Sequence, residues 1–128
     1  MSLTFNLSDN DKFHCFKPDY QERSISHALK EGRITQDDAL LINAFITERK
    51  ITNNISLKRA LKITSNLVSC RRFMQPFNEL NQQRLYRGIE KIHHADSTKN
   101  RPYSINTRAD LIRILKTFTL WLVDQGEI

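Results

Sequence analysis

The sequence predicts an all-α fold, and two observations carry this prediction. The 128 residues include only three glycines and three prolines, whereas a sheet protein uses such residues at its many turns. The stretch Tyr103–Gly126 has the apolar spacing of one long helix, with Ser104 as its N-cap and Gly126 at its C-terminal cap. The apolar side of this helix would hold Leu111, Ile114, Leu115, Phe118, Trp121 and Leu122. Because Ile105, Ile112 and Val123 widen this arc, we expect the helix to pack against more than one neighbour.

The chain is expected to begin with an arm and a short helix. Residues 1–21 show no clean period and are interpreted as a loose N-terminal arm, followed by one helical domain over residues 22–128. A short helix is expected over Glu22–Lys30 and is ended by Gly32. Its inward residues would be Ile25, Ala28 and Leu29.

A second helix is predicted to start at Thr35. Thr35 and Asp38 have the spacing of a capping box, and the apolar pattern continues to about Arg49 or Lys50. The core face of this helix is predicted to consist of Leu40, Leu41, Ala44 and Phe45, together with Ile34.

The next predicted helix carries a stripe of cations and small hydroxyl groups. Ser56 is its N-cap, and the helix is expected to run from Leu57 to about Met74. Opposite a broad apolar side, one narrow face repeats at spacings of four and three residues, so its members line up. This face consists of Lys58, Lys62, Ser65, Ser69 and Arg72. Small residues would let a phosphate backbone approach while Lys and Arg reach phosphates or base edges. The alternative is a solvated helix face, although such faces usually mix both signs of charge.

A third core helix is expected from about Asn81 to His93, with Leu85, Ile89 and Ile92 facing inward. The polar loop Ala95–Pro102 follows and carries Lys99 and Arg101 next to the start of the closing helix. Free backbone N–H groups at a helix N-terminus favour anions, so this corner is predicted to bind phosphate.

The net charge of +6 is unevenly distributed. Residues 51–128 hold thirteen Lys or Arg and six Asp or Glu, and no acid lies between Glu48 and Glu79. A basic stretch without compensating acids is typical of a surface that binds nucleic acid.

Other classes of site have little support in the sequence. Cys15 and Cys70 are interpreted as reduced thiols, and neither they nor the four histidines have the paired spacing of a zinc site. No cofactor is therefore expected. No apolar run approaches the ~18 residues that a membrane span needs, and no signal peptide is recognised, so a cytoplasmic location is expected.

The order of these elements resembles the core-binding (SAM-like) N-terminal domain of tyrosine recombinases, the phage-integrase and Xer-type enzymes. The resemblance covers roughly residues 35–128, and residues 26–50 are similar to the leading helices of archaeal integrases. The matching segments are Ser56–Met74, then Glu79, Leu80 and Asn81 with Leu85, then Ser104, Thr107, Arg108, Leu115, Phe118, Trp121, Leu122 and Gly126 to Ile128. The resemblance implies a four-helix SAM-like bundle, here with an extra N-terminal arm and short helix.

The resemblance also implies a function in DNA integration and recombination. In that family this domain clamps double-stranded DNA at the recombination site, while a C-terminal catalytic domain cuts it, and copies associate on the DNA. The catalytic set includes a His-x-x-Arg, which is missing here, so we expect a binding half without cleavage activity of its own. The expected DNA-binding residues are Lys58, Arg59, Lys62, Ser65, Ser69, Arg72, Lys99, Arg101, Asn106, Arg108, Arg113 and Lys116.

Two other functions compete with DNA binding. The first is an all-helical protein–protein interaction module, in which the apolar arc of Tyr103–Gly126 would receive a partner. The competing interpretation of the arc, which we favour, is plain core. The second is an enzyme acting alone, for which no nucleophile–base pair or metal cluster emerges from the spacing. The effect of salt distinguishes DNA binding from the protein interaction module, because DNA binding weakens steeply with ionic strength.

Overall fold

The computed structural model of the chain describes residues 19–95 and 103–128, and this part contains helices and no strand. The all-α prediction is therefore confirmed for these residues. The α-helices are α2 (Tyr20–Lys30), α3 (Gln36–Thr52), α4 (Leu57–Cys70), α5 (Gln82–His93) and α6 (Ile105–Asp124). Short 3₁₀ turns at Arg71–Phe73 and Phe77–Glu79 connect α4 to α5. The expected arm lies almost entirely outside the described residues, and α2 begins at Tyr20, two residues before the expected Glu22.

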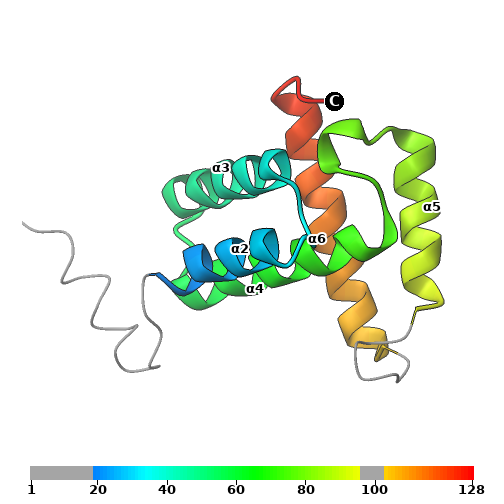
Figure 1. The fold of residues 1–128 in the computed structure, drawn as a ribbon, viewed down its shortest axis with the longest axis horizontal. Coiled ribbons are helices and arrows are strands. Elements are labelled where there is room, and N and C mark those ends of the chain that lie inside the picture. The colour runs from blue at the N-terminus through cyan, green and yellow to red at the C-terminus, as the bar shows by residue number, and fades with distance from the viewer. Residues whose placement is uncertain (1–18, 96–102) are drawn as a thin grey trace, which may run out of the picture.

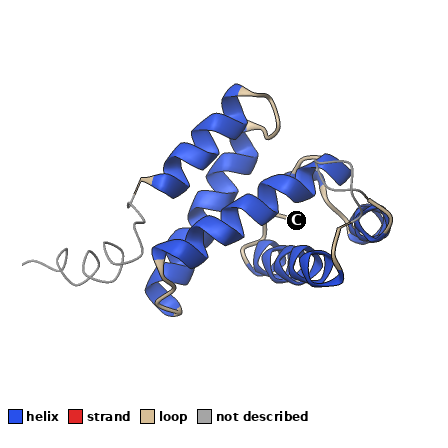
Figure 2. Ribbon diagram, turned by 90° about the horizontal axis from the view of Figure 1, so that it is seen from below, coloured by secondary structure: helices blue, strands red, loops and turns tan. Residues whose placement is uncertain are grey.

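Helix α6 is the central element of the fold. Figure 1 shows α6 passing through the middle of the molecule, with α5 on one side and α2, α3 and α4 on the other. Helix α4 packs against both α2 and α6, and α5 packs against α6. The view from below in Figure 2 shows the same all-helical arrangement. The expectation that α6 contacts more than one neighbour is confirmed.

Local capping fixes the ends of these helices as the sequence predicts. Ser56 Oγ accepts a hydrogen bond from the backbone N–H of Arg59, and Ser104 Oγ accepts one from Thr107. Gly126 has a φ of +74° after the last turn of α6. The N–H of Gly126 donates to Val123 O and that of Glu127 donates to Leu122 O, which closes the helix in a Schellman motif.

The core forms where α3, α4 and α6 meet. The six residues predicted for the apolar side of α6 are all buried: Leu111, Ile114, Leu115, Phe118, Trp121 and Leu122. Phe118 contacts Phe45 and Phe77 edge to face at ring-centroid distances of 5.1 and 5.0 Å. The indole N–H of Trp121 donates to Glu48 of α3. The apolar arc of α6 is thus core, except that Ile105, Leu120 and Val123 remain exposed.

Two expectations about packing and helix length are wrong. Leu40 and Ala44 were expected in the core but are exposed, whereas Ala39, Ile42 and Ile46 of α3 are buried. The buried side of α3 differs from the predicted one because the helix is apolar on several sides. The observed core side is the one that also carries the buried Asp38. Helix α4 ends at Cys70 rather than near Met74, so Arg72 lies in the following 3₁₀ turn.

Asp38 connects the start of α3 to the segment that follows α4. Its side chain is fully buried and accepts hydrogen bonds from the backbone N–H groups of Thr35 and Phe77, both at 2.9 Å. Arg71 Nε donates to Asp38 Oδ2 at 2.6 Å, and Arg71 Nη1 donates to Met74 O at 2.5 Å. The capping box that starts α3 therefore also holds the segment after α4.

None of the helices in the described ranges is both long and apolar enough to span a lipid bilayer.

Candidate nucleic-acid interface

The narrow polar face predicted for residues 57–74 is present on the surface as a line of side chains. We call it the α4 stripe, and it consists of Lys58, Lys62, Ser65, Ser69 and Arg72. Lys58, Lys62 and Ser65 are exposed and Ser69 is half-buried, while Ala60, Ile63, Leu67 and Val68 on the other side of α4 are buried. The helical spacing predicted this division correctly. Arg72 follows the end of α4 and is exposed as well.

The stripe meets the polar side of α6 at Asp110. Lys62 Nζ lies 3.0 Å from Asp110 Oδ2, and Arg113 Nη2 lies 2.5 Å from Asp110 Oδ1. One carboxylate therefore joins cations from two helices, and the contact between Lys62 and Asp110 spans 48 residues of sequence. This contact places two predicted DNA-binding residues, Lys62 and Arg113, on one continuous surface.

The charges around Asp110 leave a surplus of positive charge. The hydrogen bond from Lys62 lowers the pKa of Asp110, and the charges of Lys62, Arg113 and Arg59 act in the same direction, while burial opposes them. Asp110 is thus ionised at neutral pH and offsets a single charge. Three cations surround it, so the local balance stays positive.

Arg72 connects the stripe to Tyr103, which directly precedes Ser104, the N-cap of α6. Its Nη1 donates to the hydroxyl of Tyr103 at 2.8 Å, and its guanidinium lies 4.9 Å from the ring centroid of Phe73. Asn106 is exposed one turn further along α6. The predicted interface requires these residues to lie along α4 and α6. Arg72 directly follows the end of α4, and Asn106 and Arg113 lie on α6.

Of the predicted residues on α6, Arg108 does not face this surface and Lys116 lies at its border. Arg108 precedes Asp110 by two residues, about 160° around the helix, and its Nη2 donates to Tyr103 O at 2.9 Å. Lys116 is exposed and lies at the border of this surface, about 120° around the helix from Asp110 but only about 60° from Arg113. Lys99 and Arg101 lie outside the described residues.

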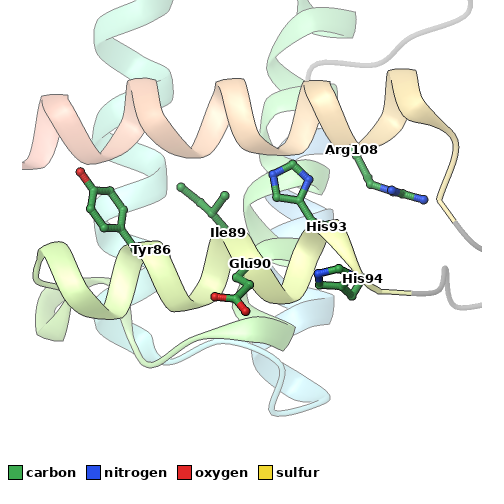
Figure 3. Close-up of a pocket in the computed structure, with 6 residues that line it drawn as sticks. All are labelled: Tyr86, Ile89, Glu90, His93, His94 and Arg108. Carbon is green, nitrogen blue, oxygen red and sulfur yellow. The ribbon is translucent and has the colours of Figure 1, made fainter.

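Arg108 instead lines an open groove of about 620 Å³ between α5 and α6. Figure 3 shows Tyr86, Ile89 and His93 extending from α5 toward α6, with Arg108 beside His93. Glu90 and His94 also line the groove. Within the described ranges, no cluster of three or more His, Cys, Asp or Glu could hold a metal ion.

Arg49 is a basic residue near the interface that the sequence analysis did not select. It lies in the last turn of α3, where its charge suits the helix dipole. In the structure it lines a pocket between α3, α4 and α6 together with Arg59 and Arg113. Its place in the acid-free stretch between Glu48 and Glu79 was the available signal.

Arg71, by contrast, belongs to the same basic stretch but is not an interface residue. Only 12% of its side chain is exposed, because it is paired with Asp38. The charge count alone could not separate such a structural cation from Lys58 or Lys62.

Comparisons of this chain with models of protein families, with curated proteins and with solved structures find no significant match.

Proposed function

We propose that this chain binds double-stranded DNA through the surface formed by the α4 stripe and the polar side of α6. The observation that carries the proposal is the junction at Asp110, where Lys62 and Arg113 from two helices share one acid. A positive surface with small hydroxyl side chains between the cations suits a phosphate backbone. Ser65 and Ser69 provide these hydroxyls on α4.

Each part of this surface has a distinct role in the proposal. Lys58, Arg59 and Lys62 contact phosphates and set the position of the protein on the duplex. Arg72, Asn106 and Arg113 are the candidates for base edges, because Arg and Asn make bidentate contacts to guanine and adenine. The structure adds a constraint to the role of Arg113, since its bond to Asp110 fixes one side of its guanidinium.

We further propose that the chain acts as the core-binding domain of a tyrosine recombinase. The support for this class is the sequence resemblance over residues 35–128, together with an all-α structure in which a basic helix packs against the closing helix. The catalytic step would then belong to a separate catalytic domain, and copies of the protein would associate on paired DNA sites.

The experiment that tests DNA binding is a salt series with two matched triple variants. The first variant is Lys58→Gln, Lys62→Gln and Arg113→Gln, which removes three cations from the proposed surface. The control variant is Lys30→Gln, Arg87→Gln and Lys91→Gln, which removes three exposed cations from α2 and α5. Both variants reduce the net charge equally, so only the position of the charges differs.

We expect wild type and the control variant to bind random duplex DNA with a steep loss of affinity at higher salt. The first variant should bind more weakly, and its log–log salt slope should be shallower by about 1.8 units, because two of its three cations, Lys58 and Lys62, are phosphate contacts in the proposal. Equal effects of the two variants would show that net charge, rather than this surface, drives binding. No binding by wild type at low salt would overturn the proposal and direct the search to a protein partner.

The recombinase class needs a test of specificity. Repeated selection from a pool of random duplexes should enrich one sequence motif, and Arg72→Ala or Asn106→Ala should relax the preference at individual base pairs. A pool that stays random after selection would leave a nonspecific DNA-binding domain and would remove the support for the recombinase proposal.

A further inference from the structure

A pocket of about 220 Å³ lies beside the proposed interface, where the end of α3, the start of α4 and the middle of α6 come together. Its apolar lining includes Phe45, Ile63 and Ile114, which are 2, 6 and 4% exposed. Ile55 adds a half-buried side chain from the loop before α4. The pocket is thus a hollow that reaches the hydrophobic core.

Three arginines from three helices line the same pocket: Arg49 of α3, Arg59 of α4 and Arg113 of α6. Arg113 binds Asp110 through Nη2. Asp110 is already shared with Lys62. An apolar hollow lined by three guanidinium groups has a clear excess of positive charge.

Arg49 has unused hydrogen-bonding capacity in this position. Its guanidinium lies 4.8 Å from the centroid of the Phe45 ring, and Nη1 makes only a long 3.5 Å bond to Asn53 Oδ1. Its Nε is buried and has no hydrogen-bond partner in the described part of the chain. Because Nε is enclosed by the protein, the terminal Nη groups are the donors of Arg49 that a ligand in the pocket would meet.

We infer that this pocket binds one nucleotide, with the phosphate held by Arg49, Arg59 and Arg113 and the base in the apolar hollow. Guanidinium groups match phosphate oxygens with paired donors. A bare inorganic anion would not use the apolar lining, and a neutral apolar ligand would not use three cations. Planar Arg and aromatic side chains also provide stacking surfaces for bases. The choice of a nucleotide over other organic phosphates rests on the proposed nucleic-acid function.

The nucleotide must be unpaired to enter. A base in a duplex is stacked and paired, so it can reach a pocket only after it is extruded or where it has no partner. The ligand is therefore either a free mononucleotide or an unpaired nucleotide of DNA, and both present the same phosphate and base.

The direct test measures binding of deoxythymidine monophosphate, thymidine and inorganic phosphate to the whole chain at low salt. We expect the nucleotide to bind about tenfold or more tightly than either part alone, in line with the usual contribution of base stacking. Equal affinities for the nucleotide and inorganic phosphate would overturn the inference, because the hollow would then contribute nothing.

Variants assign the binding to this pocket. Thr117 is exposed at the edge of the pocket, so Thr117→Phe fills the hollow without changing the charge. The matched control is Thr47→Phe, at an exposed position of α3 that lines a different surface. Thr117→Phe should abolish nucleotide binding and Thr47→Phe should preserve it. Arg49→Gln should also weaken binding, and it leaves the volume of the core unchanged. Unchanged nucleotide binding in both Thr117→Phe and Arg49→Gln would place the site elsewhere.

A final arm separates the two sources of nucleotide and separates this inference from the proposed function. A duplex with one unpaired nucleotide should bind more tightly than the matched duplex, and Thr117→Phe should remove this difference, if the ligand belongs to DNA. Nucleotide binding without this difference identifies the free mononucleotide as the ligand. Loss of matched-duplex binding would contradict the proposed function alone, whereas duplex binding without nucleotide binding would contradict the pocket alone.

Discussion

The buried carboxylate of Asp38 offers the sharpest test of the structure. The change Asp38→Ala removes the acceptor of three hydrogen bonds, from Thr35 N, Phe77 N and Arg71 Nε. The helix α3 would lose its capping box, and the segment after α4 would lose its attachment to α3. Arg71 would remain almost buried without its partner.

The expected cost follows from these contacts. Removing one partner of a buried ion pair typically destabilises a protein by about 3–5 kcal/mol, and losing a side-chain helix cap costs about 1 kcal/mol. These terms overlap, because the same carboxylate makes both contacts, so we expect a total of about 4 kcal/mol. A domain of this size has a stability of roughly 5–15 kcal/mol. The variant should therefore be folded only marginally.

Urea unfolding followed by far-UV circular dichroism and by the fluorescence of the single tryptophan, Trp121, measures this change. The matched control is Asp37→Ala, which removes an exposed carboxylate that accepts a 3.3 Å hydrogen bond from Asn78 Nδ2. The control should change stability by less than about 0.5 kcal/mol. Adding Arg71→Met to Asp38→Ala should recover part of the loss, because it removes the unpaired buried charge. A loss below about 1 kcal/mol in Asp38→Ala would refute the argument.

Further predictions concern Asp110, Cys70 and Gly126. Asp110→Asn frees Lys62 and Arg113 from their shared acid, so affinity for duplex DNA should rise. The salt slope should also steepen by roughly one unit for each new phosphate contact. Unchanged binding would show that these cations do not face DNA. The same variant tests pH dependence. Because the pKa of Asp110 is lowered, its stabilising effect is present above the ordinary carboxyl pKa and is lost as pH falls through the lowered value. The thermal unfolding temperatures of the variant and the wild type should therefore converge in acid. Burial raises the pKa of the Cys70 thiol to about 12, so in a Cys15→Ser background an aromatic disulfide reagent at pH 8 should react only as fast as the protein unfolds; rapid reaction in native buffer would contradict this burial. Gly126→Ala places a side chain at a φ of +74° and should destabilise α6 by about 1 kcal/mol in urea unfolding, whereas no change would mean that the Schellman motif is dispensable.

Features that depend on neighbouring residues in the sequence were predictable. The side-chain cap at Ser56, the capping box of Thr35 and Asp38, and the cap at Ser104 are all present as hydrogen bonds. Each involves residues three positions apart, so local pattern is sufficient to identify it. The positive φ of Gly126 follows from the same local reasoning.

Features that depend on distant residues were not predictable. The end of α4 at Cys70 reflects the pairing of Arg71 with Asp38, 33 residues earlier in the chain. The apolar pattern continues beyond this point, so periodicity extended the helix to Met74. The same contact fixes which side of α3 faces the core, and Leu40 was misplaced because its hydrophobicity gives no information about that contact.

The candidate interface shows the same division. The α4 stripe was found because its members lie on one helix at fixed spacing. Its junction with α6 was not predictable, because it depends on the contact between Lys62 and Asp110, which are 48 residues apart. Grouping Arg108 with Arg113 treated α6 as if all of its sides faced DNA, whereas Arg108 lies on the side that lines the groove toward α5.

The basic stretch between Glu48 and Glu79 therefore does not act as one unit. Arg71 is committed to the interior through Asp38, and Arg49 lines the pocket over Phe45. Lys58 and Lys62 remain on the surface, where Lys62 is held in place by Asp110. An ionised acid at the centre of a cationic surface lowers the affinity for any phosphate backbone, but it also fixes the position of two cations before DNA arrives. Fixed donors discriminate better between correct and incorrect docking than freely moving ones. If Asp110 has this role, Asp110→Asn should gain affinity for random duplexes while losing discrimination among them.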